Sequence, residues 1–365
     1  MGMSTNSNID VVYFVGTCFE NPISGGMIYN SKIANELFKI WKLIKVDYPW
    51  RGYIGGLIFD LNTCKNIIVD LVCKKKIVLF YDESLYQRMP FTLFVGLFCR
   101  KLPIVLMCHQ LSFHRKRPWL YKEFSKKIEQ IMVTNANAVV SAGDYMTSEL
   151  YKLGCEESRV KNVFATCQFP QVISLRKDPG VAVFVGSVVK SKGVFELIRA
   201  VNVLRSKYKK DIKVYVAGDK SDSKVFSACA SLIKEYDVGA SIIFLGRCSA
   251  EELSILYKEA SLFVFPSYSE TMSMALIEAM SAGCIPIVFN NSSMPYLVRN
   301  GITGWVANDL DVDDFSEKIF RCLVADESEI IMMRFMASLS VQKYVRNWQE
   351  LSQDIENVIM EVMSD

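Results

Sequence analysis

The stretch FPSYSETMSMALIEAMSAGCIPIVF, residues 265–289, decides the fold class and raises the question of function. An apolar strand ends at its start, an amphipathic helix follows, and a second apolar strand occupies 285–289. A strand, a helix and a strand in this order predict a βαβ unit of a parallel sheet. Glu270 stands at the mouth of the helix, and Glu278 lies among apolar residues, where a carboxylate is rarely buried without a partner. These two acids therefore indicate a ligand site.

Apolar, β-branched runs typical of buried parallel strands recur along the whole chain. They lie at 11–15, 77–81, 104–108, 138–141, 181–185, 214–217, 242–245, 262–265 and 285–289. Helices are predicted between them, among others at 28–42, 62–73, 119–131 and 145–153. The alternation restarts in the second half, so the sequence predicts an α/β protein with two doubly wound parallel sheets.

The domain boundary is predicted within 167–180, where two prolines and a charge cluster interrupt the pattern. This gives an N-terminal Rossmann-like domain at 1–170 and a C-terminal one at 175–340. A long amphipathic helix begins at residue 341, and we expect the segment 341–365 to pack back on the first domain. Ligands of such sheets bind beyond the carboxyl ends of the strands, so two facing sheets predict a cleft between the domains.

The composition argues against several functional classes. Of the 365 residues, 51% are hydrophobic and 22% are charged, which excludes global disorder. A net charge of +3 does not favour a nucleic-acid-binding protein. The 11 cysteines form no CxxC pair, which favours a reducing, cytoplasmic compartment over a disulfide framework or a zinc site. We expect no secretory signal, and the best apolar run, 91–99, is less than half of the roughly 20 residues of a transmembrane helix.

Two features of the first half follow strands and are candidate ligand contacts. Gly25 and Gly26 precede the first helix, where glycine lets the backbone approach a ligand, although a plain tight turn explains them equally well. His109 directly follows the strand 104–108, and the only other histidine is His114. Its position favours a site role for His109, whereas His114 is better interpreted as an ordinary loop residue.

In the second half, the segment VFVGSVVKSKG ends a strand at Gly186 and opens a helix at Lys192-Gly193. A lysine at such a turn can supply positive charge to a phosphate, but a solvated loop with Lys190 and Lys192 exposed is equally consistent.

The turn after the strand 242–245 is a further candidate. Ser249 and Glu252 form a capping box there, which leaves Arg247 available to a ligand. The unpaired amides at the start of the helix after Glu270 form an anion site. Acids that bind hydroxyl groups, next to amides and a lysine that bind phosphates, together fit a nucleotide sugar.

Glu270-x7-Glu278, followed by Ala-Met-x-Ala-Gly283-x-x-Pro286, resembles the retaining glycosyltransferases of family 4, which have the GT-B fold. The C-terminal half carries the specific part of this resemblance, and the N-terminal half matches loosely. The resemblance also takes in Gly25-Gly26, His109, Lys192-Gly193, Leu245-Gly246 and the tail at 300–305.

The resemblance implies a role for each site residue. Glu278 would hold the ribose hydroxyls, Glu270 would act at the donor sugar, and Lys192 would neutralise the leaving diphosphate. His109 would lie over the sugar near the acceptor. The remaining donor-binding positions are Gly186, Ser187, Lys190, Arg247, Cys248, Met272 and Ser273, with the base-binding turn at 246–248 and a phosphate or acceptor loop at Gly25 and Gly26.

Two positions depart from the family pattern. Ser187 stands where the family usually has arginine, so either Lys190 supplies the second charge or phosphate binding relies on Lys192 and helix amides. Thr271-Met272-Ser273 replaces the frequent Gly-Phe-Gly, so the fit of the donor sugar is expected to differ.

The resemblance implies a retaining, metal-independent enzyme without a cofactor. Family frequency favours UDP-glucose as donor, and a hydroxyl of a glycan or lipid-linked acceptor receives the hexose, in polysaccharide or glycolipid assembly. Three alternatives stay open: a GT-B phosphorylase with pyridoxal phosphate, a non-catalytic sugar-nucleotide binding module, and a GT-A enzyme with a metal at Asp311-x-Asp313. Helix capping is the better interpretation of these aspartates.

The segment 114–127, HRKRPWLYKEFSKK, interleaves basic and aromatic residues. This pattern suits peripheral contact of residues 115–127 with an anionic membrane, at the inner face in a cytoplasmic protein. A helix that packs its apolar face on the sheet is at least as consistent with the sequence.

Overall fold

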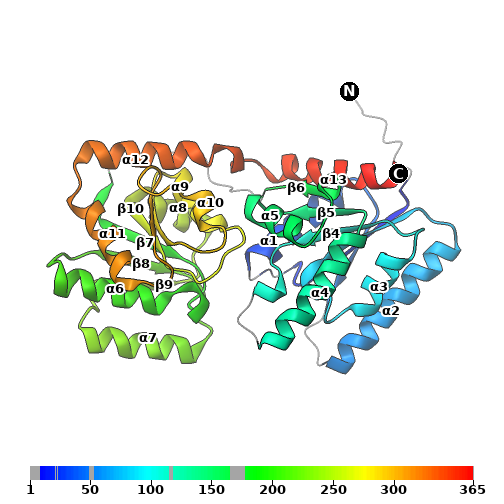
Figure 1. Cartoon of the computed structure of the whole chain (residues 1–365), viewed down its shortest axis with the longest axis horizontal. Helices are drawn as coiled ribbons and strands as arrows, with labels where there is room; N and C mark the ends of the chain where they lie inside the picture. Colours follow the sequence, from blue (N-terminus) through cyan, green and yellow to red (C-terminus); the bar gives the residue numbers. More distant parts are fainter. Residues whose placement is uncertain are drawn as a thin grey trace. The chain divides into compact units, whose positions relative to one another are not determined.

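The computed structural model describes residues 9–20, 22, 24–48, 53–114, 118–164 and 177–364. The chain divides into two compact units, each built on a six-stranded parallel sheet (Figure 1). The N-terminal unit comprises Met1–Ala165 and Asn347–Asp365, and the C-terminal unit comprises Thr166–Arg346.

The N-terminal sheet has the strand order β2-β1-β3-β4-β5-β6. Its strands are β1 (Val11–Gly16), β2 (Leu43–Asp47), β3 (Ile77–Asp82), β4 (Ile104–Cys108), β5 (Ala138–Ser141) and β6 (Val160–Asn162). Its helices are α1 (Gly25–Leu37), α2 (Tyr53–Val72), α3 (Pro90–Phe98), α4 (Trp119–Asn135), α5 (Asp144–Lys152) and α13 (Trp348–Ser364). Short 3-10 turns occupy η1 (Glu83–Leu85), η2 (Ser112–His114) and η3 (Glu157–Arg159). The strand order reverses between β1 and β3, which places a ligand-binding switch point there.

The C-terminal sheet has the strand order β12-β11-β10-β7-β8-β9. Its strands are β7 (Asp178–Val185), β8 (Lys213–Ala217), β9 (Ile242–Gly246), β10 (Ala260–Phe265), β11 (Ile285–Phe289) and β12 (Trp305–Ala307). Its helices are α6 (Val194–Lys207), α7 (Ser223–Tyr236), α8 (Ala250–Glu259), α9 (Met274–Ser281), α10 (Met294–Leu297), α11 (Val312–Val324) and α12 (Glu327–Ser340), with 3-10 turns η4 (Lys190–Lys192) and η5 (Gln342–Tyr344). The switch point of this sheet lies between β7 and β10.

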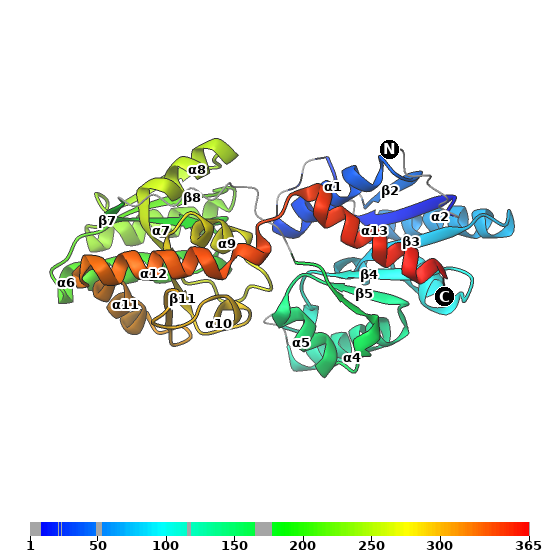
Figure 2. The same ribbon diagram turned by 90° about the horizontal axis from the view of Figure 1, so that it is seen from above.

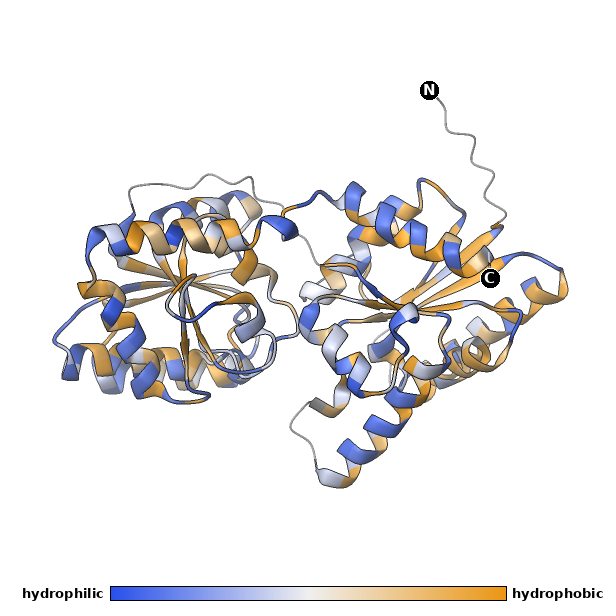
Figure 3. Cartoon of the chain, turned by 45° about the horizontal axis from the view of Figure 1, so that its top comes forward, coloured by the Kyte–Doolittle hydropathy of each residue, from blue (hydrophilic) through white to orange (hydrophobic). Residues whose placement is uncertain are grey.

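The core of each unit is its sheet. Every residue of β1, β3, β4, β5, β10 and β11 is buried, because helices cover both faces of a doubly wound sheet. Figure 3 shows the strands of both sheets as predominantly hydrophobic. Among the described helices, none is long and apolar enough to cross a membrane.

The final helix belongs to the N-terminal unit, where α13 packs against α1 (Figure 2). The rings of Tyr29 and Trp348 meet edge to face with centroids 6.0 Å apart, and Lys161 forms an ion pair of 2.6 Å with Glu361. The prediction that the final amphipathic helix begins at residue 341 is wrong. The chain forms η5 first, and α13 begins only at Trp348.

The nine predicted strands all exist, and β4, β5 and β11 agree with the prediction to the residue. Three strands were not predicted, namely β2, β6 and β12. They are short, partly exposed edge strands, so they lack a continuous apolar run.

Two further boundaries differ from the prediction. The helix predicted at 28–42 is wrong at both ends, because Ser24 caps α1 and the chain must leave the helix to enter β2. The domain boundary was predicted within residues 167–180. Residues 167–176 of this segment lie outside the described residues, and β7 already begins at Asp178.

Candidate active site

The switch point of the C-terminal sheet brings two predicted site residues into contact. Lys192 ends the turn after β7, Glu270 lies in the loop after β10, and these strands are parallel neighbours. Lys192 Nζ lies 2.5 Å from Glu270 Oε1, and the buried Ser267 hydroxyl donates to the same oxygen at 2.7 Å. The carboxylate is thus held by a cation and a hydroxyl at the carboxyl edge of the sheet.

The backbone fixes the two loops against each other. The Tyr268 amide donates to the Ser191 carbonyl at 2.9 Å, across the loops that follow β10 and β7. Gly193 has a φ of 76°, and a Cβ there would lie 1.8 Å from the Pro266 carbonyl oxygen. Only glycine permits this approach, which explains why Lys192 is followed by glycine at the start of α6.

The helix α9 begins one turn after Glu270. Ser273 is its N-cap and accepts a hydrogen bond of 3.3 Å from the Leu276 amide. Met272 is half-buried just before the cap. The first turn of α9 therefore directly follows the loop that carries Glu270, as an anion site requires, although the Leu276 amide is already bonded to the Ser273 cap.

Glu278 lies in the second turn of α9, where the Tyr257 hydroxyl donates to its carboxylate at 3.1 Å. Burial raises the pKa of Glu278 to about 7, and the hydrogen bond from Tyr257 opposes this shift only in part. Near neutral pH this carboxyl group therefore exchanges between a hydrogen-bond donor and a purely accepting form.

Among the residues that the structure describes, the other predicted donor-site residues form no hydrogen bond or ion pair with the Glu270 carboxylate. Gly186 and Ser187 follow β7, with Ser187 half-buried, and Lys190 is exposed. Arg247, 62% exposed after β9, forms an ion pair of 3.3 Å with Asp219. Burial raises the pKa of the neighbouring Cys248 thiol. Asp219, which follows β8, was missed from the sequence although it too stands just beyond a strand.

The N-terminal unit places His109 at the end of β4, next to α1. Its Nε2 lies 2.9 Å from Asn30 Oδ1, and Asn30 Nδ2 donates to Asp82 Oδ2 at 2.6 Å. A carboxylate only accepts, so the Asn30 amide must donate to Asp82 and accept from His109. The Nε2 atom then carries the hydrogen, and the neutral ring keeps the lone pair on Nδ1.

The surroundings of His109 favour its neutral form. Burial lowers the pKa of His109, and the negative charge of Asp82 opposes this shift. The ring of Tyr29 packs edge to face on the imidazole, with centroids 5.3 Å apart. A Cβ on Gly26 would lie 3.2 Å from the imidazole, so this glycine leaves room for the ring. Gly25 is the first residue of α1, after the Ser24 cap.

In the described part of the chain, no three or more His, Cys, Asp or Glu side chains lie close enough together to bind a metal ion. Asp311, half of the Asp-x-Asp spacing, caps α11 by accepting from the Asp314 amide at 3.0 Å. The capping interpretation of this motif is confirmed.

The residues around Lys192 and Glu270 lie in a segment with a known family signature. Residues 168–330 match the family model of the glycosyl transferases group 1. This segment is a group 1 glycosyltransferase domain.

A curated relative supports the assignment of the group 1 domain. The D-inositol 3-phosphate glycosyltransferase of Mycobacterium sp. (strain KMS) is 31% identical over 141 residues. The match spans 38% of this chain and 31% of the relative, so less than a third of the relative's length is matched.

Solved structures are similar to the whole chain in fold. Sucrose-phosphate synthase from Thermosynechococcus elongatus has a TM-score of 0.78 at 15% identity, over 97% of this chain and 99% of that one. Anabaena HepE, solved in complex with UDP-glucose, has a TM-score of 0.72 at 13% identity, over 96% of this chain and 99% of that one. The GT-B prediction, with two Rossmann-like domains, is confirmed as a fold class.

Proposed function

We propose that this protein is a retaining glycosyltransferase that moves a hexose from a nucleotide sugar to a hydroxyl group of a glycan or lipid-linked acceptor. UDP-glucose is the proposed donor. The contact between Lys192 and Glu270 carries the proposal, because it joins a cation and a carboxylate at the switch point of a group 1 domain. Polysaccharide or glycolipid assembly is the proposed setting.

The chemistry needs stabilisation of two opposite charges. The bond between the anomeric carbon and the diphosphate breaks, which leaves positive charge on the sugar and negative charge on the phosphate. Lys192 and the first-turn amides of α9 would stabilise the diphosphate, and Glu270 would hold the sugar hydroxyls and stabilise the reacting centre. The acceptor oxygen bonds to the anomeric carbon on the face that the diphosphate leaves, and its proton passes to a phosphate oxygen.

The remaining residues would set the fit of donor and acceptor. Glu278 would accept hydrogen bonds from the ribose, and the turn with Arg247 and Cys248 would contact the base. Ser187 and Lys190, in the segment after β7, would complete the phosphate site. His109 would act near the acceptor with the lone pair of Nδ1.

A donor screen tests the proposal most directly. Hydrolysis and transfer are measured with UDP-, GDP- and ADP-glucose, with and without EDTA. We expect release of UDP from UDP-glucose, undiminished by EDTA, and loss of this activity in Glu270→Ala while thermal unfolding is retained. Full turnover of the Glu270→Ala variant would contradict the proposed role of Glu270 in sugar transfer.

The alternatives predict different results in the same screen. A non-catalytic module would bind UDP-glucose without hydrolysing or transferring it. A GT-B phosphorylase would require inorganic phosphate, and with bound pyridoxal phosphate it would absorb in the visible range as purified.

The proposed partners also include an anionic membrane at the cytoplasmic face, contacted through residues 115–127. Arg115, Lys116 and Arg117 lie outside the described residues. In the described part of this segment, Trp119, Leu120 and Phe124 are exposed, so these side chains do not pack on the sheet. The helix does pack on the core, through Met132 and Val133, so the exposed side chains of its first turns are the ones proposed to contact the membrane.

A further inference from the structure

The outer side of α2 carries an apolar stripe that no described residue covers. Its exposed apolar side chains follow one another at intervals of three or four residues, interrupted once by Lys65, and therefore share one face of the helix. They are Ile54, Ile58, Leu61, Ile68 and Val72, with exposed fractions between 47% and 76%.

The neighbouring helices continue this stripe. Phe91, Phe94 and Phe98 lie on one side of α3 and are exposed, and the rings of Phe94 and Phe98 are 4.7 Å apart. On α4, Leu120 and Phe124 are exposed with the same spacing. Because α3 contacts both α2 and α4, the three helices lie side by side (Figure 1), and their exposed apolar residues are here together called the α2–α4 apolar face.

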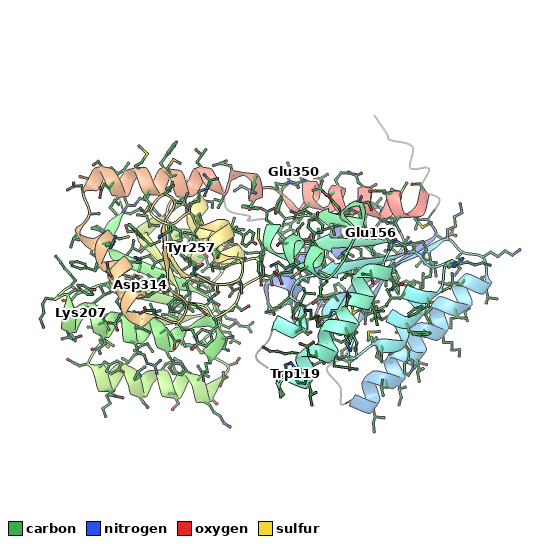
Figure 4. All side chains as sticks on the ribbon, viewed as in Figure 1. Trp119, Glu156, Lys207, Tyr257, Asp314 and Glu350 are labelled. Carbon is green, nitrogen blue, oxygen red and sulfur yellow. The ribbon has the colours of Figure 1, made fainter. Side chains whose placement is uncertain are left out.

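Isolated apolar residues on a surface are ordinary, but exposed apolar residues repeated at helical spacing on three neighbouring helices are not. Soluble proteins rarely expose an apolar patch of more than a few hundred square ångströms without a partner. Trp119 marks one end of this face, at the start of α4 (Figure 4). The helices α2, α3 and α4 each follow a strand of a parallel sheet, so their first residues adjoin the same sheet edge as His109.

The charged side chains on these helices indicate which kind of partner the α2–α4 apolar face would bind. Lys65 lies within the α2 stripe, and Lys126 and Lys127 are exposed on α4. Among the described side chains of the three helices, Glu123 is the one exposed acid, because Asp60, Asp70 and Glu129 are buried. Two copies of this face would bring like charges together, whereas an anionic bilayer complements both its cations and its apolar groups.

We propose that the α2–α4 apolar face docks on the surface of an anionic lipid bilayer. Apolar side chains enter the boundary between headgroups and acyl chains, and the lysines contact lipid phosphates. The contact extends far beyond residues 115–127, and most of it lies on α2 and α3. A role of this docking in catalysis rests on the proposed transfer to a lipid-linked acceptor. Docking would hold the sheet edge that carries His109 close to the membrane.

Vesicle flotation tests the docking without donor, acceptor or turnover, so its outcome is independent of the proposed activity. The full chain is mixed with vesicles of phosphatidylcholine alone or with one-third phosphatidylglycerol. We expect flotation with the anionic vesicles only, reduced by high salt. The double variant Phe94→Ser/Phe98→Ser should bind at least about tenfold more weakly, because two large apolar side chains no longer enter the bilayer.

A matched control uses the same residue type in the other unit. Phe335 on α12 is 52% exposed, close to the 62% and 55% of Phe94 and Phe98, and Phe335→Ser should float like the wild type. Thermal unfolding verifies that the variants fold, and Lys126→Glu/Lys127→Glu should weaken flotation without removing an apolar group.

Three results would overturn the proposal. The first is a wild-type protein that ignores anionic vesicles, and the second is equal flotation of the wild type and the Phe94/Phe98 variant. The third is a dimer that dissociates on the Phe94/Phe98 substitution in light scattering, which would assign the face to a second copy of the chain.

Discussion

Lys192 Nζ lies 2.5 Å from Glu270 Oε1, although 78 positions separate the two residues in the chain. The cation proposed to bind the diphosphate is therefore held by the carboxylate proposed to contact the sugar. A bound diphosphate must share or displace this contact, so binding and chemistry should respond differently to loss of each partner.

Glu270→Gln should separate the two roles. Removal of the negative charge releases Lys192, so UDP should bind about two- to fivefold more tightly, the scale of a partly exposed ion pair. Sugar transfer should fall by at least about a thousandfold, since the charge that stabilises the reacting centre is lost. Titration calorimetry with UDP and a transfer assay measure the two effects.

Lys192→Ala should weaken UDP binding by about tenfold or more, because a charge-assisted contact to phosphate is lost. Lys207→Ala is the control. Lys207 lies at the far end of α6, about 20 Å along the helix, and is exposed (Figure 4). Equal UDP affinity of Lys192→Ala and the wild type would contradict the proposed phosphate role.

Glu278 should make UDP binding depend on pH near neutrality. Its pKa of about 7 means that the accepting carboxylate form predominates only above pH 7. Ribose hydroxyls that donate to this group favour its charged form, so UDP affinity should fall as the pH drops through 7, by up to about tenfold per unit. Calorimetry between pH 5.5 and 8.5 measures the profile.

Glu278→Gln should bind more weakly at pH 8 and lose this part of the pH dependence. The phosphate of UDP also titrates, with a pKa of about 6, so the difference between wild type and variant is the relevant quantity. Without ligand, the raised pKa of Glu278 means that the native state binds its proton more tightly than the unfolded chain. Stability from this group should therefore be present below pH 4.5 and be lost as the pH rises to 7. Parallel profiles for both proteins would argue against the ribose role.

The contact from His109 to Asn30 predicts one imidazole tautomer. The sequence has only two histidines, so a nitrogen-15 spectrum of labelled histidine should contain two assignable sets of signals. The set that His114→Gln leaves in place belongs to His109. We expect it to show a protonated Nε2, a bare Nδ1 and a titration midpoint below 6.5, because burial lowers the pKa of His109.

Asn30→Ala should convert His109 to a mixture of tautomers and reduce the rate constant of transfer more than the affinity for UDP. A purely structural role of Asn30 would lower the unfolding temperature and leave the tautomer unchanged. A wild-type His109 with its hydrogen on Nδ1 would contradict the hydrogen-bond assignment.

The sequence predicted the buried strands well because a strand covered on both faces must be apolar along its length. Several side chains of the edge strands β2 and β6 are exposed to solvent. These strands therefore contain polar residues, and their composition resembles that of a loop. Helix ends were less predictable for a different reason: the end of α1 depends on where β2 begins, which hydrophobic periodicity does not encode.

The sequence predicted those site residues that directly follow a strand, because ligands of parallel sheets bind beyond the carboxyl ends of the strands. That rule identified His109, Lys192 and Glu270, and it would also have identified Asp82, the last residue of β3. It could not identify Asn30, which lies inside a helix and matters only because the fold brings it to His109. Likewise, the pairing of Lys192 with Glu270 follows from the strand order, which places β7 beside β10.

The approach of Gly193 to Pro266 predicts a sharp difference between two glycines of the same unit. Gly193 and Gly301 have nearly equal φ angles, 76° and 74°, but a Cβ on Gly301 would meet nothing closer than 3.8 Å. Gly301→Ala should therefore cost only the strain of a left-handed backbone, about 1 kcal/mol in the free energy of unfolding. Gly193→Ala adds a contact of 1.8 Å with the Pro266 carbonyl oxygen, which the backbone must move to relieve.

We expect Gly193→Ala to lose about 3 kcal/mol or more of stability and to bind UDP at least about tenfold more weakly, because the movement separates Lys192 from the loop of Glu270. Gly301→Ala should keep the wild-type affinity. Chemical denaturation and calorimetry measure both quantities. If the two alanine variants unfolded at the same denaturant concentration and bound UDP equally well, the close packing of these loops would not position the phosphate site.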